Sequence, residues 1–400
     1  MVPKGWKKRD LHKLITIKHG FAFKSEYFSN DGQYVLLTPG SFNESGGFRN
    51  QGPKTKFYNG PIPNGYLLSK GDLLLAMTEQ AEGLLGSPLF VPEDNKYLHN
   101  QRLGLVEINC TDNICSDFLY LFFNHADSRK QITEQSTGTK VKHTSPDRLC
   151  SVIGLIPPLL EQKKIAQILS TWDKAISVTE KLLTNSQLQK KGLMQQLLIG
   201  NNRLLDENGM KFSGEWKQDV NLGSIINISK GVQINKNTLS EDGQFPVING
   251  GIAPSGFTSE FNTDENTITI SEGGNSCGYV AFQKKSFWCG GHCYAVRKTA
   301  LDLSFTFHLL KYNEQKIMGL RVGSGLPNIQ KKALEAFTVN FPVTSVEQQK
   351  IASVLSAADA EITIMEKKLA CLRDEKKALM QQLLTGKRRV KVEAEEAVSA

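Results

Sequence analysis

Apolar residues recur at a regular interval along two long stretches of the chain. The apolar positions of the first stretch are Ile165, Leu169, Trp172, Ile176, Leu183, Leu193 and Leu197. Those of the second stretch are Ile351, Leu355, Ala358, Ile362, Met365, Leu369, Leu372, Leu379 and Leu383. Most steps alternate between four and three residues, and a mean period of about 3.5 is typical of a coiled-coil helix. The pattern therefore predicts two long helices that use these residues as a coiled-coil core.

The two stretches are copies of one sequence. Residues 161–204 align without a gap on residues 347–390, and the pair Glu-Gln opens both copies. The run Leu-Met-Gln-Gln-Leu-Leu recurs near the end of both, just before a glycine. A lysine interrupts each apolar pattern at the same place, Lys190 and Lys376, where a polar residue would specify the pairing register. The chain is therefore expected to consist of two related halves.

Each predicted helix follows a globular domain with strand signals. Apolar runs such as Leu73–Met77 alternate with glycine-rich turns. A short helix is expected in each domain, from Asp117 after a Ser116 cap and from Phe305 after a Ser304 cap. The fold class is α+β: two globular β-rich domains alternate with two long helices, in an internal pseudo-two-fold repeat. The expected segments are 1–154 (first domain), 155–200 (first helix), 201–212 (linker), 213–340 (second domain), 341–386 (second helix) and 387–400 (polar tail).

Composition narrows the class of protein. Lys and Arg number 48 against 40 Asp and Glu, a formal net charge of +8 that permits a polyanionic partner without requiring one. Seven cysteines, an odd number at low density, indicate reduced thiols in a reducing compartment. No apolar run reaches the roughly 18 residues of a membrane span, and no signal peptide is recognisable. We expect a cytoplasmic protein.

One pattern has the spacing of a metal-dependent nuclease. Asp147, Glu161 and Lys163 could hold a cation and polarise a phosphate. In the second copy, however, Lys332 replaces Asp147 and Gln349 replaces Lys163. What persists is the start of a helix, so helix capping and solvation are the favoured interpretation.

Two further patterns are also better explained by structure. The run Ile156–Leu159 lacks the polar and aromatic ends of the motif by which amino-methyltransferases hold their target. Cys289, His292 and Cys293, with Cys277 upstream, could be taken for a zinc site, but adjacent strand residues point to opposite faces. We therefore expect no catalytic residue and no metal ligand in this chain.

The assembled features resemble the specificity (S) subunit of type I restriction-modification systems, over essentially the whole chain. A tryptophan, Trp6 or Trp216, opens each domain. A proline followed by Glu-Gln-x-x-Ile-Ala closes each domain at residues 157–166 and 342–352, and each helix then ends in Leu-Met-Gln-Gln-Leu-Leu-x-Gly. The resemblance implies two target-recognition domains that read the two halves of a bipartite DNA site, without catalysis by this chain.

The resemblance also implies partners in a prokaryotic cytoplasm: double-stranded DNA, two methyltransferase subunits, and restriction subunits that join through the methyltransferase complex. That complex would be an adenine-N6 DNA methyltransferase and an ATP-dependent endonuclease. S-adenosylmethionine would be bound by the methyltransferase subunit, and ATP and Mg by the restriction subunit, with no cofactor in this chain.

The repeat fits this resemblance, because two different domains on two similar helices let one chain imitate a two-fold dimer. Helices that pair as an antiparallel coiled coil would hold the domains a fixed distance apart, which DNA converts into a base-pair spacer. Heptads alone equally allow pairing with a second chain. Two alternative functions stay open: a coiled-coil adaptor with β-rich ligand-binding domains, and an autonomous DNA nuclease.

DNA contacts are expected on loops that place polar side chains beside flexible backbone. Amide and basic side chains form the bidentate pairs that distinguish adenine and guanine, and glycines let the backbone approach. The candidates in the first domain are Lys24, Thr78, Glu79, Gln80, Gln101, Lys140, Lys142 and His143. Those in the second domain are Gln233, Asn235, Lys236, Asn249, Ser271, Asn275, Asn328, Lys331 and Lys332.

Overall fold

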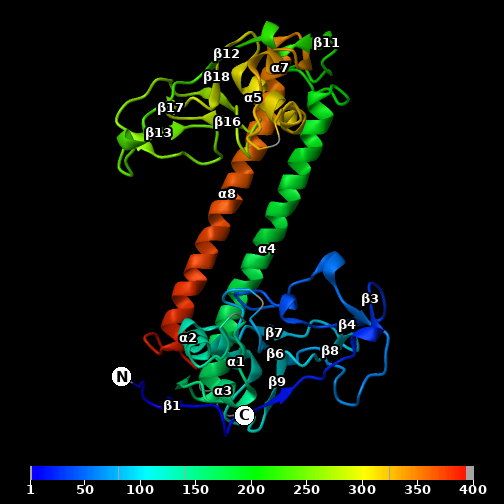
Figure 1. Ribbon diagram of the computed structural model, residues 1–400, viewed down its shortest axis with the longest axis vertical. Helices are drawn as coiled ribbons and strands as arrows, with labels where there is room; N and C mark the ends of the chain where they lie inside the picture. The colour runs from blue at the N-terminus through cyan, green and yellow to red at the C-terminus, as the bar shows by residue number, and fades with distance from the viewer. Residues whose placement is uncertain (1, 80, 140, 324, 393–400) are drawn as a thin grey trace. The chain divides into compact units, whose positions relative to one another are not determined.

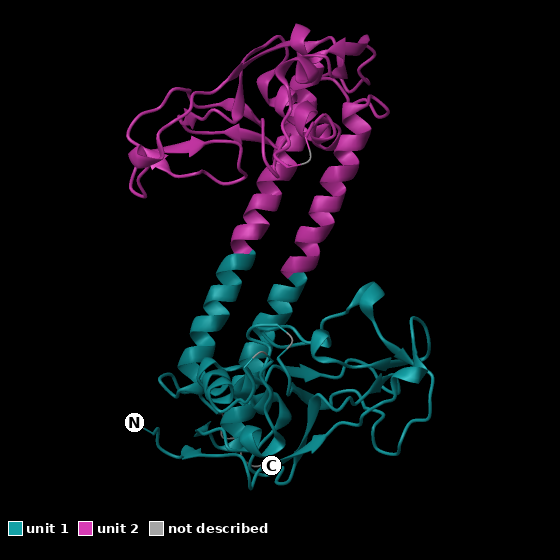
Figure 2. Cartoon of the chain, viewed as in Figure 1, with its two compact units in different colours: residues 1–178, 369–400 teal, residues 179–368 magenta. Residues whose placement is uncertain are grey.

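The computed structural model describes residues 2–79, 81–139, 141–323 and 325–392 (Figure 1). Its contacts form two compact units: unit 1 comprises residues 1–178 and 369–400, and unit 2 comprises residues 179–368 (Figure 2). The two long helices are α4 (Leu159–Leu198) and α8 (Ser345–Leu384), each of 40 residues. Each long helix therefore contributes residues to both units. The segment bounds expected from the sequence stay a prediction.

Unit 1 contains two four-stranded sheets. The first has the order β2 (Ile15–His19), β9 (Leu103–Ile108), β6 (Leu73–Ala76), β7 (Pro88–Phe90), with all neighbours antiparallel. The second has the order β3 (Phe28–Ser29), β5 (Phe57–Tyr58), β4 (Tyr34–Leu36), β8 (Tyr97–Leu98), with β4 and β8 parallel. A separate pair joins β1 (Lys7–Arg9) to β10 (Gly154–Ile156). The short helices are α1 (Ser116–Asn124), α2 (Ala126–Glu134) and α3 (Pro146–Cys150).

Unit 2 repeats this plan. Its antiparallel sheet has the order β12 (Ile226–Lys230), β18 (Cys293–Thr299), β15 (Thr267–Ser271), β16 (Val280–Gln283). A second sheet has the order β14 (Phe257–Thr258), β13 (Phe245–Ile248), β17 (Trp288–Cys289), with β13 and β17 parallel. A separate pair joins β11 (Trp216–Asn221) to β19 (Thr338–Pro342). The short helices are α5 (Leu303–Tyr312), α6 (Glu314–Met318) and α7 (Lys331–Glu335). The α+β class and the internal repeat are thus confirmed.

The halves of α4 and α8 run antiparallel within each unit. In unit 1, Lys376 Nζ donates to Asp173 Oδ1 at 2.5 Å, which joins a late residue of α8 to an early residue of α4. In unit 2, Lys190 and Asp359 form the equivalent pair with the helices exchanged. The two lysines at core-type positions are therefore neutralised across the helix pair, where an unpaired ammonium would cost stability.

The residues of the predicted coiled-coil core are partly or fully buried in their units. Its buried members are Ile165, Leu169, Leu197, Ile351, Leu355, Leu369 and Leu383. Its half-buried members are Trp172, Ile176, Leu183, Leu193, Ile362, Met365, Leu372 and Leu379. Residues near the ends of both long helices belong to the main hydrophobic core of each unit. Residues of that unit's antiparallel four-stranded sheet belong to the same core.

A buried glutamate near the start of each long helix forms an ion pair with an arginine. That arginine lies in the segment that follows the other long helix. Glu161 accepts a hydrogen bond from Trp6 Nε1 at 3.1 Å and from Arg389 Nε at 2.9 Å, and the Arg389 guanidinium lies 5.6 Å from the Trp6 ring centroid. We call these three residues the Glu161 latch. Both members of the ion pair belong to unit 1, although they lie 228 positions apart in the sequence.

The Glu347 latch of unit 2, formed by Glu347, Arg203 and Trp216, repeats the ion pair and the neighbouring tryptophan ring, but the buried Trp216 Nε1 has no hydrogen-bond partner among the described residues. Arg203 grips Glu347 with two hydrogen bonds, from Nε at 2.5 Å and from Nη2 at 2.6 Å. The guanidinium lies 5.7 Å from the centroid of the Trp216 ring. The Glu347 side chain is only 1% exposed, so its charge depends on this bidentate partner.

The glutamine that follows each latch glutamate ties the helix to a short helix of the same unit. Gln162 accepts from the Cys115 backbone N at 3.1 Å, and Gln348 accepts from the Asp302 backbone N at 2.8 Å. Cys115 and Asp302 are the N-cap residues of α1 and α5. The caps predicted at Ser116 and Ser304 are therefore wrong.

The cap error has two physical reasons, one local and one distant in the sequence. Asp302 Oδ1 accepts a hydrogen bond from Phe305 N at 2.8 Å. The Asp302 carboxylate therefore caps α5, and Ser304 lies inside the helix. Ser116 is already the first residue of α1, and the preceding backbone N–H is held by Gln162 from a distant part of the chain.

The Glu347 latch makes a stability prediction. Arg203→Met should lower the free energy of unfolding by about 3 kcal/mol, because it leaves a buried carboxylate without its partner. The double variant Arg203→Met, Glu347→Gln should recover at least half of that loss, since no unpaired charge remains. Urea denaturation followed by circular dichroism measures both.

The control is Lys331→Met, which removes the exposed Lys331–Glu335 pair of α7. An exposed pair of this kind contributes about 1 kcal/mol or less. If Arg203→Met costs no more than Lys331→Met, the latch does not hold unit 2 together.

Candidate nucleic-acid interface

In each unit, one end of the antiparallel four-stranded sheet brings together loops from several parts of the chain. In unit 2, β12 and β15 finish at the end where β16 and β18 begin, because Ser271 pairs with Cys293 and Ile270 pairs with Val280. In unit 1, β2 and β6 finish where β7 and β9 begin. We call this the loop end of each sheet. Loops at a common sheet end can present side chains from distant parts of the sequence to one ligand.

Four predicted residues of unit 1 meet at its loop end. Thr78 Oγ1 lies 3.2 Å from His143 Nδ1, within hydrogen-bonding distance. The Glu79 backbone N donates to Lys142 O at 2.9 Å, and the Lys142 ammonium lies 3.8 Å from the Glu79 carboxylate. The loop after β6 and the loop before α3 therefore form one polar cluster.

The remaining candidates of unit 1 are less closely joined. Gln101 is exposed, and its backbone N donates to Phe21 O at 2.9 Å, next to the start of β9 at the loop end. Lys24 is exposed and lies 3.6 Å from Glu26, so the structure gives it an ion pair rather than a place in the cluster. Gln80 and Lys140 lie outside the described residues.

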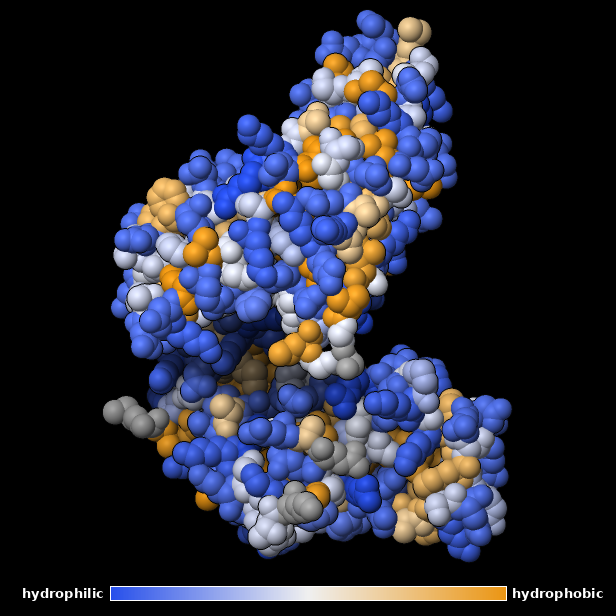
Figure 3. All heavy atoms as spheres, turned by 45° about the horizontal axis from the view of Figure 1, so that its top comes forward, coloured by the Kyte–Doolittle hydropathy of each residue, from blue (hydrophilic) through white to orange (hydrophobic). Residues whose placement is uncertain are grey.

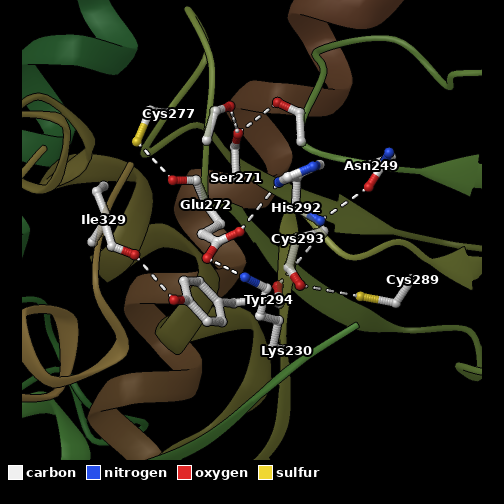
Figure 4. A network of polar contacts seen from close by, with 12 residues as sticks. Lys230, Asn249, Ser271, Glu272, Cys277, Cys289, His292, Cys293, Tyr294 and Ile329 are labelled. Carbon is white, nitrogen blue, oxygen red and sulfur yellow. Dashed lines mark hydrogen bonds and ion pairs between the residues drawn. The ribbon is translucent and has the colours of Figure 1, made fainter. Parts of the chain in front are cut away.

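The loop end of unit 2 has the corresponding construction, with different side chains (Figure 4). The loop that holds Asn328 pairs with Gly273, the second residue after β15. Asn249 Oδ1 accepts from the His292 backbone N at 3.0 Å. Ser271 is only 4% exposed and donates to Gly250 O at 2.5 Å, so this hydroxyl positions the neighbouring loop instead of facing solvent.

The other candidates of unit 2 are exposed. Gln233 lies beside Gly291, where an added Cβ would stand 2.6 Å from its Oε1, so glycine permits this approach. Asn235 Oδ1 accepts from Asn237 N at 3.1 Å, which gives Asn235 a turn-forming role. The remaining exposed candidates are Lys236, Asn275, Lys331 and Lys332.

Sequence reasoning missed a charged cluster at this loop end, made of one glutamate, one lysine and one histidine. Glu272 follows β15 directly, and its carboxylate pairs with Lys230 Nζ and lies 3.5 Å from His292 Nδ1 (Figure 4). The sequence pattern suggests His292 only as a metal ligand. A glutamate between a buried strand and two glycines is the signal that could have identified the cluster.

The cysteines of unit 2 have structural surroundings. Cys289 and Cys293 are buried, and the Cys277 thiol donates to Glu272 O at 2.9 Å. A hydrogen bond with Cys289, together with burial, raises the pKa of Cys293. Across the described ranges, no three His, Cys, Asp or Glu residues are placed to hold a metal ion. All seven cysteines of the sequence lie in those ranges, and all are free.

The surface is mostly polar on the face that Figure 3 shows, where apolar residues occur in small scattered groups. The described helices include none that is long and apolar enough to cross a membrane.

Comparisons with known proteins agree on one family. A family model described as the type I restriction modification DNA specificity domain matches residues 3–186 and 214–373. A Mycoplasma pneumoniae protein, provisionally named a type I specificity subunit, is 38% identical over 144 residues, which are 35% of this chain and 38% of that protein. The specificity subunit of the type I restriction enzyme MjaVIII from Methanocaldococcus jannaschii is 26% identical over 306 residues, which are 69% of this chain and 71% of that protein.

The fold has a known counterpart. The crystal structure of a type I restriction-modification S subunit from M. genitalium matches 96% of this chain and 96% of its own, with a TM-score of 0.68 and 19% sequence identity. At that identity the match shows the fold alone. The chain spans about two fifths of the length of the Mycoplasma pneumoniae relative.

The loop end of unit 2 makes a binding prediction. The double variant Lys331→Gln, Lys332→Gln should weaken binding to random-sequence double-stranded DNA, because it removes two exposed positive charges that phosphates would attract. The slope of log affinity against log salt should fall by about one for each lysine that binds a phosphate. Filter binding of the full chain between about 50 and 200 mM salt measures both.

Lys284→Gln, Lys285→Gln is the matched control, because these exposed lysines follow β16 at the opposite end of the same sheet. It removes the same charge and should leave affinity and slope nearly unchanged. Equal effects of the two double variants would mean that the loop end is no preferred DNA surface.

Proposed function

Because the chain belongs to the family of type I restriction-modification DNA specificity domains, we propose that it reads a bipartite double-stranded DNA site, with one half-site for each unit. The observation that carries the proposal is the repeated loop end. Both units have the same antiparallel strand order and place loops from distant segments at the same end of the sheet. The side chains presented there differ.

Different side chains on one scaffold suit the reading of two different sequences. Unit 1 offers Thr78, Lys142 and His143 in one cluster. Unit 2 offers amides, among them the exposed Asn328, and amides are suited to adenine edges. Base edges carry the sequence information, whereas phosphate contacts only position the protein.

We infer that two methyltransferase subunits dock on equivalent surfaces of the repeat and that restriction subunits join through them. The support is the pseudo-two-fold design, in which both latches and both cross-helix ion pairs recur. In this proposal the chain supplies no catalytic group. S-adenosylmethionine belongs to the methyltransferase subunit, and ATP and Mg belong to the restriction subunit.

The nuclease alternative has an observation against it. Glu161, which a metal triad would require, is already bound by Trp6 and Arg389. Asp147 is exposed and bonds to His12 at 3.1 Å. The adaptor alternative predicts no DNA binding, so a salt titration of DNA binding by the full chain tests it directly.

Specificity should be modular. Replacing residues 213–340 by the corresponding segment of another family member should change one half of the recognised site and leave the other half intact, because each loop end is built within its own unit. Methylome sequencing of cells that carry the hybrid and its methyltransferase partner gives the recognised site. A hybrid that altered both halves would contradict one half-site per unit.

The paired helices should act as a ruler between half-sites. Four residues inserted between Val178 and Thr179, and four between Lys368 and Leu369, keep both cross-helix ion pairs on their own sides of the insertion. Four helical residues add about 6 Å, which is about two base pairs. The recognised site should keep both half-sequences and gain about one or two unspecified positions, as read by methylome sequencing.

Four residues inserted in the turn after Asp206 serve as the control, since this linker lies outside both long helices. That variant should keep the original spacer. An active complex whose spacer is unchanged by the paired helix insertion would rule out the ruler.

A further inference from the structure

We propose that Glu272 reads an amino group on a base and so determines specificity in unit 2; this inference rests on the proposed function. Cytosine N4 and adenine N6 are the amino donors exposed in the major groove, and a carboxylate accepts from them. Neither the sequence pattern nor the family match singles out this residue.

The backbone of Glu272 is held by three separate segments. Its N–H donates to His292 O at 2.9 Å. Its carbonyl accepts from Ile329 N at 2.8 Å and from the Cys277 thiol at 2.9 Å. Because β15 ends immediately before it, the side chain starts from a fixed point on the inner strands of the sheet. A fixed starting point is what a specific base contact requires.

The Glu272 carboxylate is oriented by two partners but keeps free hydrogen-bond acceptor sites. The side chain is 13% exposed, Oε1 pairs with Lys230, and Oε2 lies 3.5 Å from His292 Nδ1 (Figure 4). A carboxylate offers about four lone-pair sites, so acceptor capacity remains for a base. Lys230 and His292 are both more exposed than Glu272, so all three side chains are partly open to solvent.

An acidic residue is unexpected on a DNA-binding surface, because a carboxylate repels the phosphates of DNA. Lys230 offsets that repulsion locally. With that repulsion offset, the Glu272 carboxylate favours DNA groups that can donate a hydrogen bond to it directly. Base amino groups are donors of that kind. An acidic side chain at a DNA-facing surface therefore selects for amino-bearing bases and against the others.

Unit 1 also has an acid paired with a lysine at its loop end, but at a different loop position. The Met77 carbonyl accepts from Thr144 N as the Glu272 carbonyl accepts from Ile329 N, so Met77 is the counterpart of Glu272 by backbone pairing. The acid of unit 1 is Glu79, two residues further on. Its side chain is 14% exposed and is paired with a lysine, Lys142.

A purely structural role has different consequences. If Glu272 only positions Lys230 and His292 for phosphates, its removal weakens binding equally for every DNA sequence. If Glu272 reads a base, its removal changes the base preference at one position of one half-site and leaves the other positions unaffected.

The test is Glu272→Gln in the full chain with its methyltransferase partner. Duplexes that carry each base pair in turn at every half-site position are titrated, and the methylome of cells with the variant is sequenced. Preference at one position of one half-site should fall on the order of tenfold, with the other half-site unchanged. A thermal melt checks that the isosteric variant is folded.

Three variants complete the design. Glu260→Gln removes an exposed acid from the loop after β14 and should change nothing. Lys230→Gln should weaken binding uniformly, and Glu79→Gln should alter only the other half-site. A uniform loss of affinity for Glu272→Gln, or an unchanged site, overturns the inference. A wild-type complex that selects no bipartite site overturns the proposed function itself.

Discussion

Each unit is closed by a buried carboxylate at the start of one long helix, which binds an arginine that follows the end of the other. Glu161 with Arg389 and Glu347 with Arg203 join residues 228 and 144 positions apart. Because a buried charge is costly without its partner, this ion pair constrains where each helix end can lie. The adjacent Gln162 and Gln348 then transmit that constraint to the first backbone donor of a short helix.

The cross-helix pairs extend the same principle along the helices. Asp173 with Lys376 and Asp359 with Lys190 occupy equivalent places in the repeat. Lysine at a core-type position lowers stability unless it is paired, so these positions favour one antiparallel register over its neighbours. The latches and these pairs give each unit a scaffold whose sheet can carry different loops at one end without changing how the helices meet.

The loop ends show how similar scaffolds can carry different chemistry. Thr78 and His143 meet in unit 1, whereas Glu272 is bracketed by Lys230 and His292 in unit 2. Backbone pairs hold these loops in both units, Thr78 with His143 and Gly273 with Asn328, so exposed side chains there can vary at little cost. The resemblance to a specificity subunit is physically reasonable for this reason.

The sequence alone determined the long helices, the repeat and the α+β class, because periodicity and identity are properties of the chain read in order. It could not assign the caps, since Asp302 and a distant glutamine decided them. It selected Ser271 as a contact although that side chain is buried, and it overlooked Glu272 one residue later. Only the tertiary structure decided these points. The burial of a side chain and its hydrogen-bond partners depend on which distant segments meet at the end of the sheet, and no local sequence pattern specifies which segments those are.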